Sequence, residues 1–400
     1  MAITRRQFLR QSALAVAGAG VTNIIGITGP AKKVLILGAG MAGLAAGYEL
    51  SRLGHDITII EARTRPGGRV FTFREPFADG LHAEAGAARI RENHKLTHKY
   101  VKEFDLPLEP FYPSKLNVVR FDLDGRREEP INGYTDAMTQ HYGAELGGEP
   151  EIWHTIKGGM DLLPKAFAAR LSEKIHYGCA VVRIDQDSKQ ATAKFLKDGS
   201  PQTISADVVL CTIPFSVLRR LDLPGLSARK KSLIKQTPYD NVARVYLQTR
   251  NRFWEKNGLN GFAFTKDGIE IWQPTWDQPG PRGILMTYAR PTESDQIASL
   301  KEPKRIATTV DQLDSIFTGL RPNVERAVTK CWNEDEWSRA AWGFVGFENL
   351  LTAAAREGRI FFAGEHLSPL YSWIQGALGS AMIAVKQIDE TAVAWFANRR

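Results

Sequence analysis

The sequence has 400 residues, of which 43% are hydrophobic and 24% are charged. This length and composition exclude a disordered chain and a single small core, and they suit two interleaved domains. The formal net charge is +8, but Lys and Arg are spread along the chain and no nucleic-acid-binding module is recognisable, so no nucleic-acid partner is expected. The cysteines lack metal-ligand spacing, which predicts buried thiols and no metal site: Cys179, Cys211 and Cys331.

The first 30 residues are typical of a targeting segment. The run Thr4-Arg5-Arg6-Gln7-Phe8-Leu9-Arg10 matches a twin-arginine export pattern, and residues 12–28 carry no charge. We therefore expect export to the periplasm or the medium, with the segment either removed or kept as a membrane tether. The alternative is an ordinary amphipathic helix with a chance Arg-Arg pair. No other run approaches the ~18 apolar residues that a membrane-spanning helix requires.

A glycine-rich turn follows between two apolar runs. Residues 34–37 lead into Gly38-Ala39-Gly40-Met41-Ala42-Gly43, and a second apolar run at 57–60 ends on Glu61. The pattern predicts strand, turn, helix and strand, in which Gly38 permits the turn, Gly40 lets a pyrophosphate approach and Gly43 lets the helix lie close to the strand. Glu61 is placed to accept a hydrogen bond from a ribose. The stretch therefore predicts a dinucleotide site, with Ala42 beside the glycines.

The residues that follow narrow the dinucleotide to FAD. The run Glu61-Ala62-Arg63-Thr64-Arg65-Pro66-Gly67-Gly68-Arg69 resembles the EAxxRxGGR signature of flavin-dependent amine oxidases, and nicotinamide enzymes have no need of this extension. The resemblance covers roughly residues 33–394. It implies an α/β and α+β fold, with a Rossmann-like FAD-binding domain interleaved with a mixed-sheet substrate domain. It also implies FAD contacts from Ala62, Arg63, Gly68 and Arg69.

The expected FAD-binding domain comprises residues 31–86, 157–236 and 346–400, and the expected substrate domain comprises 87–156 and 237–345. Alternating apolar residues predict strands at 180–184, 191–195 and 207–212 that complete the FAD domain. The resemblance places the backbone near Val181 against the adenine. The alternative is that Val181 is an ordinary core valine.

A second resemblance concerns the substrate. The run Ala83-Glu84-Ala85-Gly86-Ala87-Ala88-Arg89-Ile90 looks like the segment of L-amino-acid oxidases in which an arginine forks onto the substrate carboxylate. It implies that Ala87, Ala88 and Arg89 lie at the flavin and that Arg89 binds the carboxylate, since a guanidinium offers two parallel donors. The alternative is that Arg89 pairs with a protein carboxylate or with a flavin oxygen.

Three features depart from the family pattern. Residues 111–153 lack the long helical insertion of L-amino-acid oxidases and offer only a strand at 116–123 and a helical pattern at 136–142, so a more open site, or one closed by a partner subunit, is expected. Arg244 stands where amine oxidases have a lysine that holds a water near flavin N5, and arginine cannot act as a base. Its alternatives are substrate binding or a surface position. Ala341 stands where mammalian monoamine oxidases have a flavin-bonding cysteine, so the FAD should be noncovalent.

The C-terminal third resembles the remaining parts of the family's site. Residues 332–342 resemble its tryptophan-led loop, and Phe362-Ala363-Gly364-Glu365 followed by Trp373-Ile374-Gln375-Gly376-Ala377 resembles its second FAD fingerprint. Trp342 and Trp373 fall at the two walls of the amine oxidase cage, with core positions as the alternative for each. A strand over 269–273 brings Trp272 or Gln273 to the pocket wall. The cofactor contacts that the resemblance implies in this third are Trp332, Gly364, Glu365, Trp373, Ile374 and Ala377.

These resemblances imply an FAD-dependent L-amino-acid oxidase as the leading hypothesis. Hydride would pass from the substrate Cα to flavin N5, the imine would be hydrolysed to a 2-oxo acid and ammonia, and O2 would be reduced to hydrogen peroxide. Catalysis would rest on positioning and desolvation by Arg89, Arg244, Trp342 and Trp373. The alternatives are a primary amine or polyamine oxidase, and an FAD-dependent amine dehydrogenase or a flavoprotein that is not an oxidase. Homo-oligomers are common in the family.

Overall fold

The computed structural model describes residues 30–122, 125–130, 152–266, 269–289 and 291–397. The predicted export segment and the helical pattern at 136–142 lie outside these residues. The chain forms two compact units, each built from separate stretches: unit 1 is Met1–Gly68, Phe167–Pro238 and Gly343–Arg400, and unit 2 is Arg69–Ala166 and Tyr239–Trp342. Residues 69–86 and 157–166 therefore lie in unit 2, whereas the bounds expected from the sequence assign them to the FAD-binding domain.

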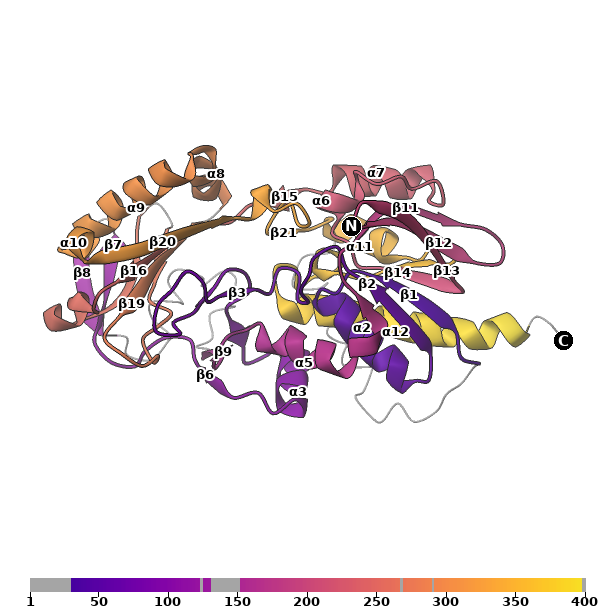
Figure 1. Ribbon diagram of the computed structural model, residues 1–400, viewed down its shortest axis with the longest axis horizontal. Helices are drawn as coiled ribbons and strands as arrows, with labels where there is room; N and C mark the ends of the chain where they lie inside the picture. Colours follow the sequence, from indigo (N-terminus) through magenta and orange to yellow (C-terminus); the bar gives the residue numbers. More distant parts are fainter. Residues whose placement is uncertain (1–29, 123–124, 131–151, 267–268, 290, 398–400) are drawn as a thin grey trace. The chain divides into compact units, whose positions relative to one another are not determined.

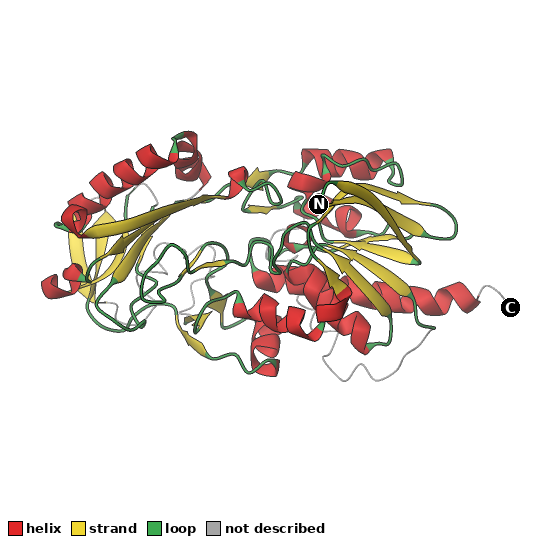
Figure 2. Ribbon diagram, in the orientation of Figure 1, coloured by secondary structure: helices red, strands yellow, loops and turns green. Residues whose placement is uncertain are grey.

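Unit 1 is organised around a five-stranded sheet in the order β10-β2-β1-β14-β22, and every neighbouring pair in it is parallel (Figures 1 and 2). Its central strands are mostly apolar, with KVLIL in β1 and VVLC in β14, as expected for a parallel sheet that is covered on both faces. Helix α2 (Met41–Arg52) connects β1 to β2, and it packs against the C-terminal helix α12 (Ile374–Ala397). The strands are β1 (Lys33–Leu37), β2 (Asp56–Ile60), β10 (Ile175–His176), β14 (Val208–Cys211) and β22 (Ile360–Phe362).

A three-stranded antiparallel sheet, β11-β12-β13, completes unit 1 with short helices. The three predicted strands at 180–184, 191–195 and 207–212 are confirmed as β11, β12 and β14. All three cysteines are buried and free, as the sequence predicts. The further elements of this unit are β11 (Cys179–Gln186), β12 (Ala191–Lys197), β13 (Ser200–Ala206), α6 (Phe215–Leu218), α7 (Ala228–Gln236), α11 (Phe347–Ala354), and the 3-10 helices η1 (Ser172–Lys174) and η4 (Glu365–Leu367).

Unit 2 is organised around a seven-stranded mixed sheet in the order β20-β16-β19-β18-β17-β7-β8. The helices α8 (Pro291–Ser299), α9 (Glu302–Ile316) and α10 (Leu320–Asn323) accompany it, and η2 (Phe253–Asn257) precedes β17. Its strands are β7 (Asn117–Asp122), β8 (Gly125–Pro130), β16 (Ala243–Thr249), β17 (Leu259–Phe264), β18 (Glu270–Trp272), β19 (Gly283–Tyr288) and β20 (Val324–Cys331).

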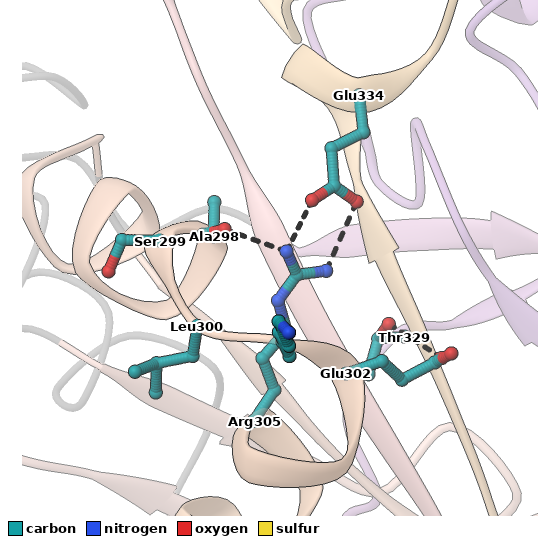
Figure 3. Close-up of a pocket in the computed structure, with 8 residues that line it drawn as sticks. Ala298, Ser299, Leu300, Glu302, Arg305, Thr329 and Glu334 are labelled. Carbon is teal, nitrogen blue, oxygen red and sulfur yellow. Dashed lines mark hydrogen bonds and ion pairs between the residues drawn. The ribbon is translucent and has the colours of Figure 1, made fainter.

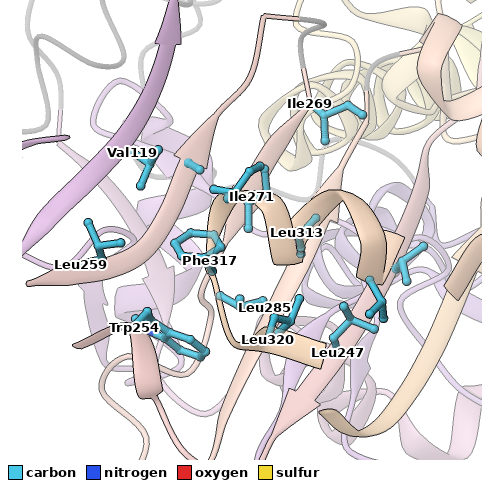
Figure 4. Close-up of a cluster of buried hydrophobic side chains, with 14 of the residues drawn as sticks. Val119, Leu247, Trp254, Leu259, Ile269, Ile271, Leu285, Leu313, Phe317 and Leu320 are labelled. Atoms are coloured by element: carbon cyan, nitrogen blue, oxygen red, sulfur yellow. The ribbon is translucent and has the colours of Figure 1, made fainter. Parts of the chain in front are cut away.

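The side-chain alternation of this sheet separates an apolar face from a polar face. Val245, Ile271 and Leu285 belong to a buried cluster with Leu313 of α9 and the following Phe317 (Figure 4). Because successive side chains of a strand point to opposite faces, the residues between these strand positions face away from the cluster. The other face of the sheet therefore carries the side chains Arg244, Tyr246, Glu270, Trp272 and Tyr288.

Smaller elements of unit 2 carry the segment around Arg89. A two-stranded sheet joins β3 (Thr72–Phe73) to β4 (Ala83–Glu84), and a three-stranded sheet has the order β5-β9-β6. Helix α5 (Leu162–Arg170) runs from unit 2 into unit 1. Among the described residues, no helix combines the length and apolar character needed to cross a membrane. The remaining elements are β5 (Ile90–Arg91), α3 (Lys95–Glu103), β6 (Leu108–Pro110), β9 (Trp153–Ile156), β15 (Tyr239–Asp240), η3 (Trp332–Glu334) and β21 (Trp342–Gly343).

Candidate functional site

The glycine-rich turn of unit 1 has the geometry of a phosphate cradle. Gly38 has φ +107°, and a Cβ there would lie 2.8 Å from Thr212 Oγ1. A Cβ on Gly43 would lie 2.0 Å from the carbonyl oxygen of Gly38, so the helix approaches the strand too closely for any other residue. A Cβ on Gly40 would meet nothing within 4 Å. Gly38 and Gly43 thus serve the fold, whereas Gly40 faces open space.

The first turn of α2 leaves its backbone donors available. Gly40 is the N-cap residue, and as a glycine it has no side chain to accept a hydrogen bond from the first turn. The free N–H groups and the positive end of the helix dipole favour an anion at this point. Ala42 and Gly43 lie in the first helical turn, beside the open space at Gly40. These residues fit the pyrophosphate of a dinucleotide.

Glu61 closes the turn from the end of β2. Its side chain is buried, Oε2 accepts from the Ala39 N–H at 2.7 Å, and Oε1 accepts from the Arg63 N–H at 2.9 Å. A carboxylate accepts about four hydrogen bonds, so Glu61 retains acceptor capacity for a ribose hydroxyl. The backbone at Ala62 and Arg63 is therefore fixed beside the glycine-rich turn.

The second glycine pair docks on the first. The Gly67 N–H donates to the carbonyl of Ala39 at 2.8 Å, and a Cβ on Gly68 would lie 3.5 Å from the Cα of Gly40. Both Gly67 and Gly68 have positive φ, a conformation that glycine adopts without strain. The glycine pair of the EAxxRxGGR run therefore packs directly against the glycine-rich turn.

Sequence reasoning missed Thr212. Its Oγ1 donates to the carbonyl of Leu37 at 2.8 Å and approaches that of Gly38 at 3.2 Å. The residue follows β14, which is paired in parallel with β1. In the sequence, Thr212 is recognisable only as a threonine directly after a buried strand. Its contact with the glycine-rich turn follows from the pairing of β14 with β1.

The C-terminal fingerprint lies at the carboxyl edge of the five-stranded sheet, directly after β22. Glu365 follows β22 with its side chain buried, and its Oε2 accepts from the Ser372 N–H at 2.9 Å. The Gly364 N–H donates to Ser380 Oγ at 2.9 Å. Trp373 precedes Ile374, the first residue of α12, and the carbonyl of Trp373 accepts from the Ala377 N–H at 3.4 Å. A long helix therefore begins at the predicted WIxGA motif.

Val181 and Trp332, two further predicted cofactor contacts, are both buried. Val181 lies in β11 opposite Phe195 and is 9% exposed, which is compatible with a core position and with a backbone contact to the adenine. In unit 2, the indole of Trp332 is buried and its Nε1 donates to the carbonyl of Ala85 at 2.9 Å. Trp332 thereby supports the backbone that leads to Ala87 and Ala88.

Arg69 and Trp342 both form hydrogen bonds near Asp240, the last residue of β15. Arg69 Nη1 donates to the carbonyl of Ala341 at 2.8 Å, and the Ala341 N–H donates to the carbonyl of Asp240 at 2.9 Å. Trp342 Nε1 donates to Asp240 Oδ2 at 2.9 Å. The arginine of the first FAD signature therefore holds the backbone at Ala341.

Arg89 lies in an enclosure of aromatic rings in unit 2. Its guanidinium carbon is 4.5 Å from the Trp153 ring centroid and 4.7 Å from that of Trp272, and Tyr288 and Phe111 are also near. The side chain is 9% exposed, and Nη1 lies 3.5 Å from Oε2 of the fully buried Glu270. Burial opposes the charged form, but Glu270, Tyr112 and Tyr288 raise the pKa of Arg89, which stays protonated.

Arg244 lies on the same sheet face as Glu270. It is buried, and its Nη1 donates to the carbonyls of Glu84 and Gly86, both at 2.7 Å. Its guanidinium carbon lies 5.3 Å from the Trp272 centroid and 5.0 Å from that of Tyr288. It is therefore not a surface cation, and it braces the segment that leads to Arg89.

Glu84 adds no negative charge to this cluster near neutral pH. Its carboxyl is buried and accepts from the Met160 N–H at 2.8 Å and from Thr72 Oγ1 at 2.9 Å. Burial raises the pKa of Glu84 to about 8, and these hydrogen bonds counteract only part of that effect. Near pH 7 most of this carboxyl is therefore protonated.

Trp272 and Gln273 lie on opposite sides of the sheet. Trp272 belongs to the enclosure of Arg89, whereas Gln273 packs beside Gly261 near Trp254 of the apolar cluster. Neither polar atom of the Gln273 amide has a hydrogen-bond partner within the described part of the chain. Of the two candidates for the pocket wall, Trp272 is thus the one beside Arg89.

A separate hollow of unit 2 is polar and lies between α8, α9 and β20. Arg305 extends across it to Glu334 and also donates to the carbonyl of Ala298 at 2.7 Å (Figure 3). Thr329 Oγ1 donates to Glu302 at 2.9 Å. These side chains satisfy one another, and none of the predicted site residues lines this hollow.

The parallel sheet, the uncapped helix and the paired signatures of unit 1 define a dinucleotide-binding flavoprotein. The sequence matches the family of flavin-containing amine oxidoreductases over residues 41–140 and 131–389. The chain belongs to this family, and it is an FAD-dependent oxidoreductase that acts on amines.

Amino-acid oxidases are among the relatives of this chain. Flavin-dependent L-tryptophan oxidase RebO of Lentzea aerocolonigenes is 30% identical, over 90% of this chain and 98% of that protein. L-amino-acid oxidase BmooLAAO-I of Bothrops moojeni is 24% identical, over 92% of each chain.

Amine oxidases are among the solved structures with a similar fold. Putrescine oxidase bound to putrescine superposes with a TM-score of 0.76 at 18% identity, over 90% of this chain and 99% of that one. Cyclohexylamine oxidase from Brevibacterium oxydans IH-35A gives a TM-score of 0.76 at 17% identity, over 90% and 99%. At this identity the likeness concerns the fold alone.

Proposed function

We propose that the protein oxidises L-amino acids to 2-oxo acids and ammonia. The observation that carries the proposal is the charge of the enclosure in unit 2. Arg89 and Arg244 both lie against Trp272 and Tyr288, and Glu270 is a carboxylate that acts on Arg89. Since Glu84 is mostly neutral near pH 7, the guanidiniums of Arg89 and Arg244 give this enclosure a positive character among the residues that the structure describes. A buried charge is costly unless it is paired, so an anionic group of the substrate suits this enclosure.

The α-carboxylate of an amino acid is such a group. Arg89 would hold it with parallel N–H donors, and Arg244 would keep the segment of Arg89 in place. The aromatic rings exclude water and favour the neutral amine, whose lone pair assists loss of the Cα hydride. Bound FAD supplies the hydride acceptor. The resulting imine would be hydrolysed after release, and O2 is the proposed final electron acceptor, which gives hydrogen peroxide.

A second candidate is the oxidation of amines that carry no carboxylate. It is favoured by the ion pair of Arg89 with Glu270, because a guanidinium that already has a protein counter-ion needs no anionic substrate. The indole of Trp342, fixed by Asp240, also suits a simple amine. In this case Arg89 and Glu270 would stabilise the wall of the site and would not contact substrate.

The Arg89→Met variant distinguishes the two candidates. The FAD-loaded protein is assayed for peroxide with L-tryptophan against tryptamine and with L-phenylalanine against phenethylamine. A carboxylate role predicts that KM for the amino acids rises about a hundredfold or more while the values for the amines change little. Equal changes for acid and amine would reject the proposal. The matched control is Arg321→Met, whose side chain is 59% exposed.

The electron acceptor is tested separately, because Arg244 replaces the lysine of other amine oxidases. Reduced enzyme is mixed with O2 in a stopped-flow instrument. Rapid reoxidation with one peroxide per turnover is expected of an oxidase. Reoxidation far slower than turnover with an artificial acceptor would show a dehydrogenase.

Export by the twin-arginine pathway is part of the same proposal, and it rests on the pattern of residues 4–10, which includes Arg5 and Arg6, and on the uncharged stretch 12–28. Cell fractionation of the native protein and of the Arg5→Lys, Arg6→Lys double variant tests it. The native chain should accumulate outside the cytoplasm with FAD bound, and the variant should remain inside. Equal distribution of the two would reject this route.

A further inference from the structure

Helix α7 of unit 1 carries only positive charge. Its sequence, ARKKSLIKQ, contains no carboxylate, and three of its cations are exposed: Arg229, Lys231 and Lys235. A helix face that is only solvated commonly mixes both signs, as α9 does with EPKRIATTVDQLDSI. The composition of α7 is therefore unusual for a helix that contacts nothing but water.

This charge opposes the stability of α7 in two ways. Arg229 and Lys230 lie in the first turn, which has no acidic residue, and cations are unfavourable at the positive end of the helix dipole. Lys231 and Lys235 are four residues apart, where like charges repel each other. Among the residues that the structure describes, Arg229, Lys231 and Lys235 form no ion pair that would offset this repulsion.

The positive charge continues beside α7. Arg219 and Arg220 follow α6 directly and are exposed, and α6 contacts α7 at the edge of unit 1 (Figure 1). Arg219 Nη2 donates to the carbonyl of Thr237, the residue after α7, at 2.7 Å. Asp222, the one carboxylate of the sequence between α6 and α7, forms an ion pair with Arg183. We call this cluster the basic surface, and it consists of Arg219, Arg220, Arg229, Lys231 and Lys235.

An exposed leucine adjoins the basic surface. Leu351 of α11 is 78% exposed, which is the largest fraction for a large hydrophobic side chain in the described part of the chain. Helix α11 packs against α7, since Lys230 Nζ donates to the carbonyl of Thr352 at 2.8 Å and Arg229 Nη2 donates to Thr352 Oγ1 at 3.4 Å. Leu351 thus lies one residue from a direct contact of α7.

The basic surface keeps an excess of positive charge. Two carboxylates border it: Glu348, which is exposed on α11, and Glu357, whose Oε2 accepts from the Ser227 N–H at 2.8 Å. They do not balance the cations of the surface. Cations are attracted to anionic headgroups, and an apolar side chain among them can enter the boundary of the acyl chains. A single-stranded nucleic acid would instead favour aromatic stacking residues, and α7 has none.

We propose that the basic surface, together with Leu351, docks unit 1 on the headgroups of an anionic lipid bilayer. The protein would lie on the membrane surface through this edge of unit 1. The inference goes beyond the oxidation of amino acids and does not depend on it, because none of its residues belongs to the proposed substrate site.

Cosedimentation of the full, FAD-loaded chain with lipid vesicles tests the proposal. One set of vesicles contains equal parts of phosphatidylcholine and phosphatidylglycerol, and the other contains phosphatidylcholine alone. The native protein should prefer the anionic set, and added salt should weaken that binding. Each cation near an anionic membrane strengthens binding about fivefold, so the Arg229→Gln, Lys231→Gln, Lys235→Gln triple variant should bind about a hundredfold more weakly. Leu351→Ser should lose about fivefold.

The matched control is the Lys256→Gln, Lys301→Gln, Lys304→Gln triple variant, which changes three exposed cations of unit 2 and lowers the net charge equally. It should bind anionic vesicles as the native protein does. Flavin content and Tm, compared with those of the native protein, show that both triple variants are folded. Equal losses in the two would mean that net charge alone attracts the vesicles, and this would overturn the proposal.

Other results would also overturn it. Equal binding of the native protein to both kinds of vesicle, or native affinity in the α7 triple variant, would show attachment by another part of the chain. An unchanged affinity in Leu351→Ser would reject the insertion of the leucine. A single-stranded RNA oligonucleotide is the last probe. If the native protein binds it more tightly than it binds anionic vesicles, and the α7 triple variant loses this binding, the partner is a nucleic acid and not a membrane.

Discussion

The guanidinium of Arg244 donates to the carbonyl oxygen of Glu84 at 2.7 Å. The same carbonyl accepts from the hydroxyl of Tyr246 at 2.7 Å, and Arg244 also binds the carbonyl of Gly86. Two side chains of β16 thus tie down the segment that leads to Arg89. Arg244, at the position where the family resemblance implies a lysine, thus braces the backbone that leads to Arg89.

Replacement of Arg244 by Met should destabilise the protein. The change leaves the buried carbonyl of Gly86 without this donor, and hydrogen bonds to a charged group contribute ~1.5–3 kcal/mol each. We expect a loss of about 3 kcal/mol in the free energy of unfolding, measured with urea on the FAD-free protein. Arg250→Met, at a side chain that is 65% exposed, is the control and should change it little. Equal effects of the two substitutions would contradict the brace.

Glu84 should make stability fall as the pH rises. Its pKa is about 8 in the folded chain against an ordinary value of 4.5, so the folded protein keeps a proton that the unfolded chain releases. The free energy of unfolding should decrease between about pH 4.5 and 8 and level off above, by up to roughly 5 kcal/mol at ~1.4 kcal/mol per pH unit. Glu84→Gln should lack this part of the slope in urea titrations. Identical slopes for the two proteins would show that Glu84 is ionised in the fold.

Two glycines of the turn should respond differently to alanine. A Cβ on Gly40 meets nothing in the FAD-free protein, so Gly40→Ala should leave its Tm nearly unchanged and still weaken FAD binding. Gly43→Ala places a Cβ 2.0 Å from the carbonyl oxygen of Gly38 and should lower both Tm and flavin content. Flavin absorbance per protein and thermal unfolding measure the two effects. Gly379→Ala, in an open position of α12, is the control; full flavin content in Gly40→Ala would place the pyrophosphate elsewhere.

Lys230 should stabilise unit 1 through the end of α11. Its Nζ is buried and donates to the carbonyls of Thr352, Ala353 and Ala355 at 2.7–2.8 Å. Lys230→Met keeps the aliphatic volume but leaves these acceptors without the amine, and a loss of about 2–3 kcal/mol is expected. Lys231→Met changes an exposed neighbour and is the control in urea unfolding. A loss below about 0.5 kcal/mol would mean that water replaces the amine.

Local patterns were sufficient for the nucleotide-binding half of the site. Gly38, Gly40 and Gly43 have distinct predicted roles that follow from spacing within one strand-turn-helix unit, and the structure shows the close approaches expected at Gly38 and Gly43. Glu61 lies at the end of the next strand, as its spacing predicts. Such features are readable because hydrogen bonding and steric limits act over a few residues along the chain.

The substrate half of the site depended on distant partners. The family resemblance implied that Arg89 binds the substrate carboxylate and left open whether Arg89 instead pairs with a protein carboxylate. Glu270 lies 181 residues away, and only the pairing of β18 with β19 places it and Tyr288 beside each other. Thr212 was overlooked for the same reason, because its contact with Leu37 exists only where β14 lies against β1.

The sequence by itself determined the family, the cofactor and the side chains available to the site, because the glycine spacing and the two FAD fingerprints are local constraints of a dinucleotide turn. The tertiary structure decided what those side chains contact. Sheet register turned Trp272 toward Arg89 and Gln273 toward the apolar cluster, since neighbouring residues of a strand face opposite sides. Burial also affects the carboxyl groups. The Glu84 carboxyl is removed from water and keeps its proton, whereas Glu270 lies beside the cation of Arg89.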